Sequence, residues 1–168
     1  MKKILESQKL FLREFNLDDC QFVIELLNTE GWLKYIGNRN VQNEAQAKVY
    51  LENGSLKSYK ENGFGLYLVA LKTQEPIGMC GFVKRENVED VEIGFAFLPA
   101  YQKKGYAFEI VSETMKYGFE TLKLPKITAV ALANNTNSIK LLEKLGLIYE
   151  RKFQKENQDL LLFVKNVN

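Results

Sequence analysis

Hydrophobic and polar residues recur along the chain with two different periods, which predict about seven strands and four helices. Alternation with a period of two favours a strand, and apolar residues three and four positions apart favour a helix. Strands are predicted over residues 8–15, 65–72, 77–84, 90–98, 127–133, 147–155 and 160–165. Helices are predicted from residue 16 to near 31, from 43 towards 59, from 102–107 to 122, and over 139–145, with a short aromatic segment at 32–36.

Local start and stop signals divide these elements. Asn16 followed by Asp18 and Asp19 is typical of a helix N-terminus, where the helix dipole favours acids. Pro99 cannot donate to a strand ladder, so the strand before it must end or diverge there. The resulting order is βαα βββ α β α ββ. It predicts one α+β domain over residues 1–168, with a mostly antiparallel sheet and one parallel crossover through the long helix.

Composition changes this picture little. The 168 residues are 46% hydrophobic and 26% charged, which is ordinary for one globular domain. The net charge of +2 comes without a block of like charge, so neither nucleic acid nor a membrane surface is an expected partner. The first residues lack the apolar core of a signal peptide, and we expect a cytoplasmic protein with Cys20 and Cys80 reduced and inert.

The absence of histidine excludes several chemistries. With His 0 in the sequence, no Ser-His-Asp or Cys-His catalytic site is available. The same absence removes the zinc sites that contain histidine, and two cysteines sixty positions apart form no CxxC pair. No metal is therefore expected.

The junction between residues 92 and 107 (EIGFAFLPAYQKKGYA) is the most informative segment. A strand that stops at a proline and leads through a glycine-containing turn into a helix leaves backbone N–H groups at a positive helix end. Such an end binds anions, and Lys103 and Lys104 add two cations. The alternative is a solvated basic turn that binds no ligand, in which Gly105 only allows the backbone geometry of the turn. Neither a Walker P-loop nor a dinucleotide turn matches this segment.

Three segments in this order resemble the GCN5-related N-acetyltransferases (GNAT). Residues 102–107 (QKKGYA) match the Q/R-x-x-G-x-G/A signature, the strand from Glu92 to Pro99 resembles the strand that precedes it, and residues 135–146 resemble the NxxS…LEKLGF helix. The two ends of the chain resemble the RimJ/RimL-like branch of ribosomal-protein N-acetyltransferases. The resemblance implies a GNAT fold, whose mixed sheet splays into a V after the fourth strand.

The same resemblance implies a binding site for acetyl-CoA as co-substrate. The signature turn would hold the pyrophosphate, the splayed strand would pair with the pantetheine amides and polarise the thioester carbonyl, and the asparagine of NxxS would touch the pantetheine arm. These roles map to Lys103, Lys104, Gly105, Tyr106 and Ala107; to Phe97 and Leu98; and to Asn135. A simple helix cap is the alternative role for Asn135, and both roles can coexist.

Glu92 and Ser138 are the candidate catalytic residues. Acetyl transfer needs a neutral amine, and at pH 7 a lysine-like amine is ~4.6 kcal/mol short of deprotonation whereas an α-amine is only ~1.4 kcal/mol short. Glu92 is the candidate base, acting directly or through water, unless it faces solvent. The resemblance implies that Ser138 is a general acid for the leaving thiolate, and the alternative is first-turn capping. No tyrosine lies in the helix where many family members carry one.

The expected reaction is direct transfer to a primary amine in a ternary complex. The acceptor would be a protein or peptide N-terminus or a small-molecule amine, with Trp32, Tyr35 and Asn38 as candidates for one wall of its site. A catalytically silent acyl-CoA-binding sensor or scaffold is the alternative from another class. A nucleotide-binding regulatory domain is a third interpretation, disfavoured by the missing ribose-binding acid. A monomer and a homodimer both remain open.

Overall fold

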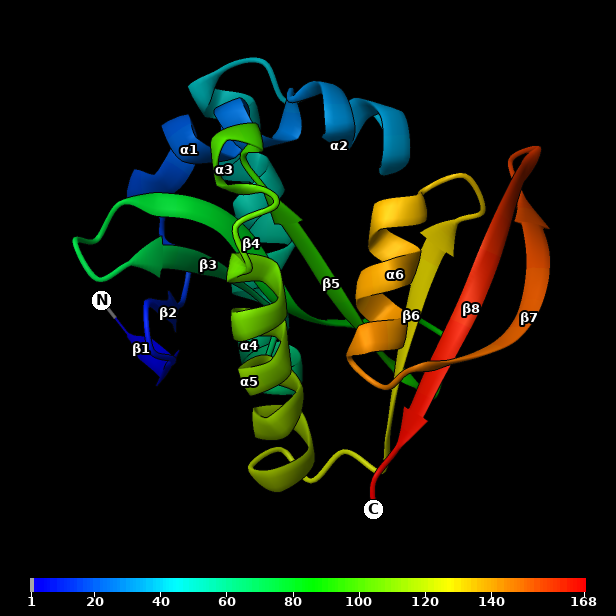
Figure 1. The fold of residues 1–168 in the computed structure, drawn as a ribbon. Coiled ribbons are helices and arrows are strands. Elements are labelled where there is room, and N and C mark those ends of the chain that lie inside the picture. Colours follow the sequence, from blue (N-terminus) through cyan, green and yellow to red (C-terminus); the bar gives the residue numbers. More distant parts are fainter. Residues whose placement is uncertain (1) are drawn as a thin grey trace.

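A single mixed sheet organises the chain in the computed structural model, which describes residues 2–168 (Figure 1). Within these residues eight strands lie in the order β1-β2-β3-β4-β5-β6-β8-β7. Their bounds are Lys3–Glu6, Leu10–Arg13, Leu66–Leu71, Pro76–Lys84, Val91–Phe97, Lys126–Leu132, Ile148–Lys155 and Gln158–Asn166 for β1 to β8. Neighbouring strands are antiparallel except β5 and β6, which are parallel. The mixed, mostly antiparallel sheet with one crossover is therefore confirmed.

The helices outnumber those expected from the sequence. Among the described residues α1 to α6 cover Cys20–Leu27, Glu30–Tyr35, Glu44–Asn53, Ser55–Asn62, Tyr106–Glu120 and Thr136–Lys144, with short 3-10 turns at Leu17–Asp19 and Pro99–Tyr101. The helix predicted over 43–59 is broken at Gly54, whose backbone leaves the helical region. The aromatic segment at 32–36 lies in α2 and ends at its C-cap residue, Ile36. None of these helices is long and apolar enough to cross a membrane.

One further strand, β1, was not predicted from the sequence. It pairs with β2 through only a few residues and carries just two adjacent apolar residues, Ile4 and Leu5. So short a segment has no periodicity to detect, and it is a strand because β2 offers it an edge. Met1 lies outside the described residues.

Two apolar clusters hold the helices against opposite faces of the sheet. In one cluster α5 and α6 pack on residues such as Tyr67, Phe82 and Ile127, and both helices lie in front of the sheet in Figure 1. In the other, α1 to α4 pack on residues such as Phe11 and Met79, although Tyr59 of α4 reaches the first cluster and stacks on Tyr67. Helix α5 lies close to the sheet because residue 118 is glycine: a Cβ there would approach Phe82 Cζ to 2.7 Å.

The sheet opens between its two parallel strands. Strands β5 and β6 pair only at Val91 with Ile127 and at Glu92 with Thr128, and β5 then continues to Phe97 without a partner on that side. The paired end is held by an ion pair between Asp90 and Lys126, at 3.1 Å. The predicted V-shaped splay is thus confirmed, and the elements of the candidate site lie around it.

Candidate functional site

The open edge of β5 presents backbone groups to the V. The Leu98 N–H donates to the Ile77 carbonyl at 2.9 Å, and the β4–β5 register continues without a shift. Because hydrogen-bonding alternates along an antiparallel strand, the N–H and C=O groups of Ile93, Phe95 and Phe97 point away from β4 and into the V. Of the two predicted residues Phe97 and Leu98, Phe97 therefore lies on the open edge, whereas the Leu98 N–H is used within the sheet.

The turn that follows β5 leads directly to the N-terminus of α5. Gly105 is the N-cap residue, has a φ of 84°, and supplies no side-chain cap. The N–H groups of the first turn, including those of Tyr106 and Ala107, therefore lack the partner that a capping side chain gives elsewhere. Lys103 and Lys104 are exposed beside this helix end. The turn has the geometry and charge of an anion site.

A glutamine joins this turn to the open strand. Gln102 Nε2 donates to the Phe97 carbonyl at 2.9 Å, across the 3-10 turn at Pro99–Tyr101. The bond fixes the turn relative to the end of β5. The open backbone edge and the uncapped helix end thus form one continuous surface.

The acid in the first turn of α5 is engaged elsewhere. Glu109 Oε2 accepts hydrogen bonds from Ser7 Oγ at 2.5 Å and from the Lys9 N–H at 2.8 Å. These bonds hold the β1–β2 turn against α5. The Glu109 carboxylate is therefore not the partner of the N–H groups at the start of α5.

Glu92 lies on the face of the sheet that carries α1 to α4. Its neighbours Val91 and Ile93 belong to the cluster under α5, so alternation places Glu92 and Gly94 on the other face. Its side chain is 20% exposed and pairs with the Arg85 guanidinium, with Nε–Oε1 at 3.3 Å and Nη2–Oε2 at 3.4 Å. A Cβ at residue 94 would meet only Leu66, at 3.6 Å, so the space beside Glu92 is open.

The N-terminus of α6 brings Asn135 and Ser138 together. Asn135 Oδ1 accepts from the Ser138 N–H at 3.3 Å, so Asn135 caps the helix. The Ser138 hydroxyl is half-buried and makes no hydrogen bond to another residue of 2–168. Helix α6 packs in the same cluster as α5, so Ser138 and Glu92 lie on opposite faces of the sheet with the V between them.

The three residues predicted to form one wall of the acceptor site have three different environments. Trp32 is 6% exposed within the cluster of α1 to α4, and its Nε1 has no partner among the described residues. Tyr35 is half-buried, and exposed Asn38 accepts from the Asn40 N–H at 2.8 Å. A cavity of about 590 Å³ is lined by residues that follow them in the chain and includes none of the three.

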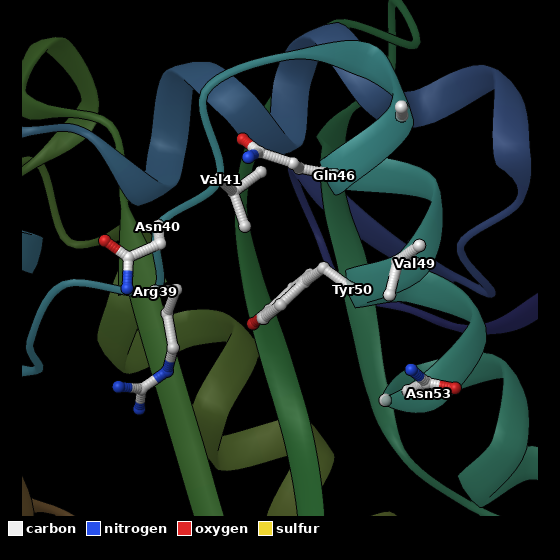
Figure 2. Close-up of a pocket in the computed structure, with 9 residues that line it drawn as sticks. Arg39, Asn40, Val41, Gln46, Val49, Tyr50 and Asn53 are labelled. Atoms are coloured by element: carbon white, nitrogen blue, oxygen red, sulfur yellow. The ribbon is translucent and has the colours of Figure 1, made fainter.

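This cavity lies between the segment after α2 and helix α3. In Figure 2 Tyr50 projects from α3 towards the sheet, with Arg39 on the opposite side. Burial raises the pKa of Tyr50, and the nearby Arg39 opposes that shift. The full lining is Arg39, Asn40, Val41, Ala45, Gln46, Val49, Tyr50, Asn53 and Gly54.

Sequence reasoning did not single out three residues: Arg39 and Tyr50, which line this cavity, and Arg85, which pairs with Glu92. No motif marks any of them, because each is placed by packing or strand register. For metal, residues 2–168 contain no group of three or more Cys, Asp or Glu side chains that could hold an ion.

Comparisons with known proteins agree with this geometry. Residues 9–148 match the family model described as an acetyltransferase (GNAT) domain. The N-acetyltransferase YnaD of Bacillus subtilis is 31% identical over 152 residues, covering 90% of this chain and 86% of the relative. A GNAT-family acetyltransferase from Bacillus anthracis superposes with a TM-score of 0.79 at 29% identity, covering 96% and 97% of the two chains.

A more distant solved structure shows the same fold. RimL, a ribosomal α-N-protein acetyltransferase solved in complex with coenzyme A, gives a TM-score of 0.86 at 14% identity, covering 99% of this chain and 98% of RimL. At that identity the likeness extends to the fold alone. Together with the match over residues 9–148, the splayed β5 edge and the uncapped α5 turn lead to one conclusion: the chain belongs to the GNAT family of N-acetyltransferases.

Proposed function

We propose that this enzyme transfers the acetyl group of acetyl-CoA directly to a primary amine in a ternary complex. One observation carries the proposal: the unpaired edge of β5 leads, through the Gln102–Phe97 hydrogen bond, into the uncapped N-terminus of α5. An extended chain of amides ending in a pyrophosphate matches this surface in order, because the strand edge offers amide partners and the helix end offers an anion site.

The binding roles follow from this order. The turn of Lys103, Lys104 and Gly105, with the N–H groups of Tyr106 and Ala107, would hold the pyrophosphate. The open edge of β5 would pair with the pantetheine amides, with Phe97 offering its N–H because Gln102 already donates to the Phe97 carbonyl. Asn135 and Ser138 lie at the N-terminus of α6, which packs on the same face of the sheet as α5, and Asn135 would contact the pantetheine arm while it caps that helix.

The chemistry needs few protein groups. Acetyl-CoA supplies an activated thioester, whose carbonyl is attacked by the amine lone pair as the new N–C bond forms and the C–S bond breaks. A backbone N–H on the open edge of β5 would stabilise the oxyanion. Glu92 would accept the amine proton, directly or through water, and Ser138 would donate to the departing thiolate. Their positions on opposite faces suit these two roles.

A second candidate function is an acyl-CoA-binding module without turnover. The observation that favours it is the ion pair between Arg85 and Glu92, which occupies the proposed base. The two candidates differ in turnover and share cofactor binding.

The deciding experiment combines two measurements on the full chain. Calorimetry measures acetyl-CoA binding, and free CoA release is then followed with a panel of N-terminal peptides and small amines. Binding with amine-dependent release supports the enzyme, and binding with no release for any amine supports the module. Absence of binding overturns both.

A further inference from the structure

The half of the sheet formed by β6, β8 and β7 has an apolar face that belongs to neither core cluster. Register places one side of β6, β8 and β7 on this face: Val130 opposite Leu162, Leu132 opposite Leu160, and Leu160 opposite Phe153. We name these residues, with Val164, the C-terminal sheet face. They are buried or half-buried, yet none of them is in the clusters formed by α5 and α6 or by α1 to α4.

This face continues directly from Glu92. Glu92 pairs with Thr128 on β6, and Thr128 pairs with Val164 on β8, so all three side chains lie on one side of the sheet. Neighbouring strands are about 4.8 Å apart and Thr128 occupies the nearer one, which puts the nearest apolar residues, Val130 and Val164, roughly 8 to 10 Å from Glu92. The cluster of α1 to α4 ends at β5, with Ala96 and Leu98. The apolar face is therefore the floor next to the proposed reaction centre.

The charges around this floor are unsuited to a polycation. Apart from the bulged Glu150, Glu92 is the one carboxylate that register places on this face within β5 to β8 of the described chain. Arg85 already pairs with it, and Arg151 lies opposite Leu162 on the same face. On these strands a polyamine would meet two guanidinium groups and, apart from the bulged Glu150, no unpaired carboxylate, while Glu86 and Glu89 lie beyond the floor in the exposed loop after β4.

The occupied base also favours one kind of amine. An α-amine needs only ~1.4 kcal/mol to become neutral at pH 7, so it depends little on a base that is shared with Arg85. Strand β7 is exposed over most of its length at the edge of the sheet, where a peptide backbone has room. Both features point to a peptide N-terminus.

We propose that the acceptor is a peptide or protein N-terminus whose first residue has a large apolar side chain, and that this side chain lies on the C-terminal sheet face while the amine meets Glu92. The inference rests on the proposed acetyl transfer and adds the chemical class of its acceptor. Burial of the side chain against Val130 and Leu162 supplies the specificity, because the polar side chain of a serine or aspartate would lose its hydration there.

The test uses peptides of one sequence that differ only in their first residue. We expect kcat/KM for Leu- and Phe-initiated peptides to exceed that for Ser- and Asp-initiated peptides by about tenfold or more, and spermidine to be a poor acceptor. Leu162→Ala reduces the preference for the Leu peptide over the Ser peptide at least about fivefold and does not change the affinity for acetyl-CoA.

Leu161→Ala is the matched control for this variant. Leu161 is the adjacent residue of β8, but its side chain packs on the opposite face against the cluster of α5 and α6. Equal effects of the two variants, equal rates for all first residues, or faster transfer to spermidine or small amines would each overturn the proposal.

Two readouts separate the remaining explanations. If Leu162→Ala changes the mass measured by light scattering and leaves peptide preference intact, a second copy of the chain covers this face and the proposal is wrong. If acetyl-CoA does not bind at all, the proposed function fails first. If transfer occurs without preference for an apolar first residue, only this inference fails.

Discussion

The Arg85 guanidinium contacts the Glu92 carboxylate through two bonds, Nε–Oε1 at 3.3 Å and Nη2–Oε2 at 3.4 Å. Arg85 follows β4 and Glu92 lies near the start of β5, so the pair spans the ladder beside the closed end of the V. Because the Arg85 side chain is 55% exposed, the pair contributes at most about 1 kcal/mol to stability. Its main effect is to orient Glu92.

Replacing Glu92 by glutamine removes the proposed base and keeps the shape of the side chain. We expect kcat to fall about 100-fold with an alkylamine acceptor of high pKa, and less with an α-amine peptide, which is easier to deprotonate. Acetyl-CoA affinity should not change. Steady-state rates across pH check this, with Glu89→Gln in the exposed β4–β5 loop as the control. Identical pH profiles for Glu92→Gln and the unmodified enzyme would rule out the base role.

Gly105→Glu places a bulky anion at the uncapped end of α5. We expect it to weaken acetyl-CoA binding more than tenfold in calorimetry, because its charge and bulk oppose a pyrophosphate at the proposed site. Gly63→Glu is the matched control: φ is 84° at residue 105 and 78° at residue 63, and a Cβ meets no atom within 4 Å at either. Both variants carry a backbone strain of about 1–2 kcal/mol. Equal affinities in the two would contradict the phosphate assignment.

Asp19→Ala breaks a buried ion pair that anchors the start of α1. The Arg13 guanidinium donates to both Asp19 oxygens, at 2.9 and 2.8 Å, and the Asn16 N–H donates to Asp19 at 2.9 Å. Removing the carboxylate leaves Arg13 charged and largely buried, so the free energy of unfolding should fall by about 3–5 kcal/mol. Urea unfolding measures this. The exposed neighbour Asp18→Ala should cost about 1 kcal/mol or less.

Cys80 gives the native state a specific sensitivity to alkali. Burial raises the pKa of this thiol from 9.0 to about 12, against the opposing hydrogen bond with Thr114. Between these values the unfolded chain loses a proton that the folded chain keeps, so this group lowers the free energy of unfolding by about 1.4 kcal/mol per pH unit. Below pH 9 the contribution is constant. Burial also raises the pKa of Tyr59 and Tyr67, which adds to the loss above pH 10.

The measurement for Cys80 is urea unfolding at several pH values from 8 to 11. The free energy of unfolding of Cys80→Ala should decline less steeply with pH than that of the unmodified protein. The difference in slope should correspond to the release of about one proton on unfolding. Parallel declines in the two proteins would show that another group is responsible. The slope is the readout, so a change in absolute stability caused by the smaller side chain does not affect the result.

Most of the elements could be predicted because their signals are local. Alternation along residues 91–97 and 126–132 marks strands whatever surrounds them, and Asn16, Asn43 and Asn135 accept backbone N–H groups as helix caps. The elements that could not be predicted depend on neighbours. β1 is too short to show a period and forms because β2 offers it an edge. The helix over 43–59 divides at a single glycine, Gly54, and packing decides whether the chain continues as one helix or as two.

For the site, the sequence by itself determined the chemistry of the turn, since the residues of 102–107 are adjacent in the chain and the turn needs only a glycine and a helix start. The tertiary structure decided everything that depends on register: that Phe97 rather than Leu98 opens into the V, that Arg85 pairs with Glu92, and that Glu92 shares its face with Val164 and Leu162. The reason is physical. A strand presents two faces with the same period, and only its pairing with distant strands and the packing of helices fix which of them meets the acceptor.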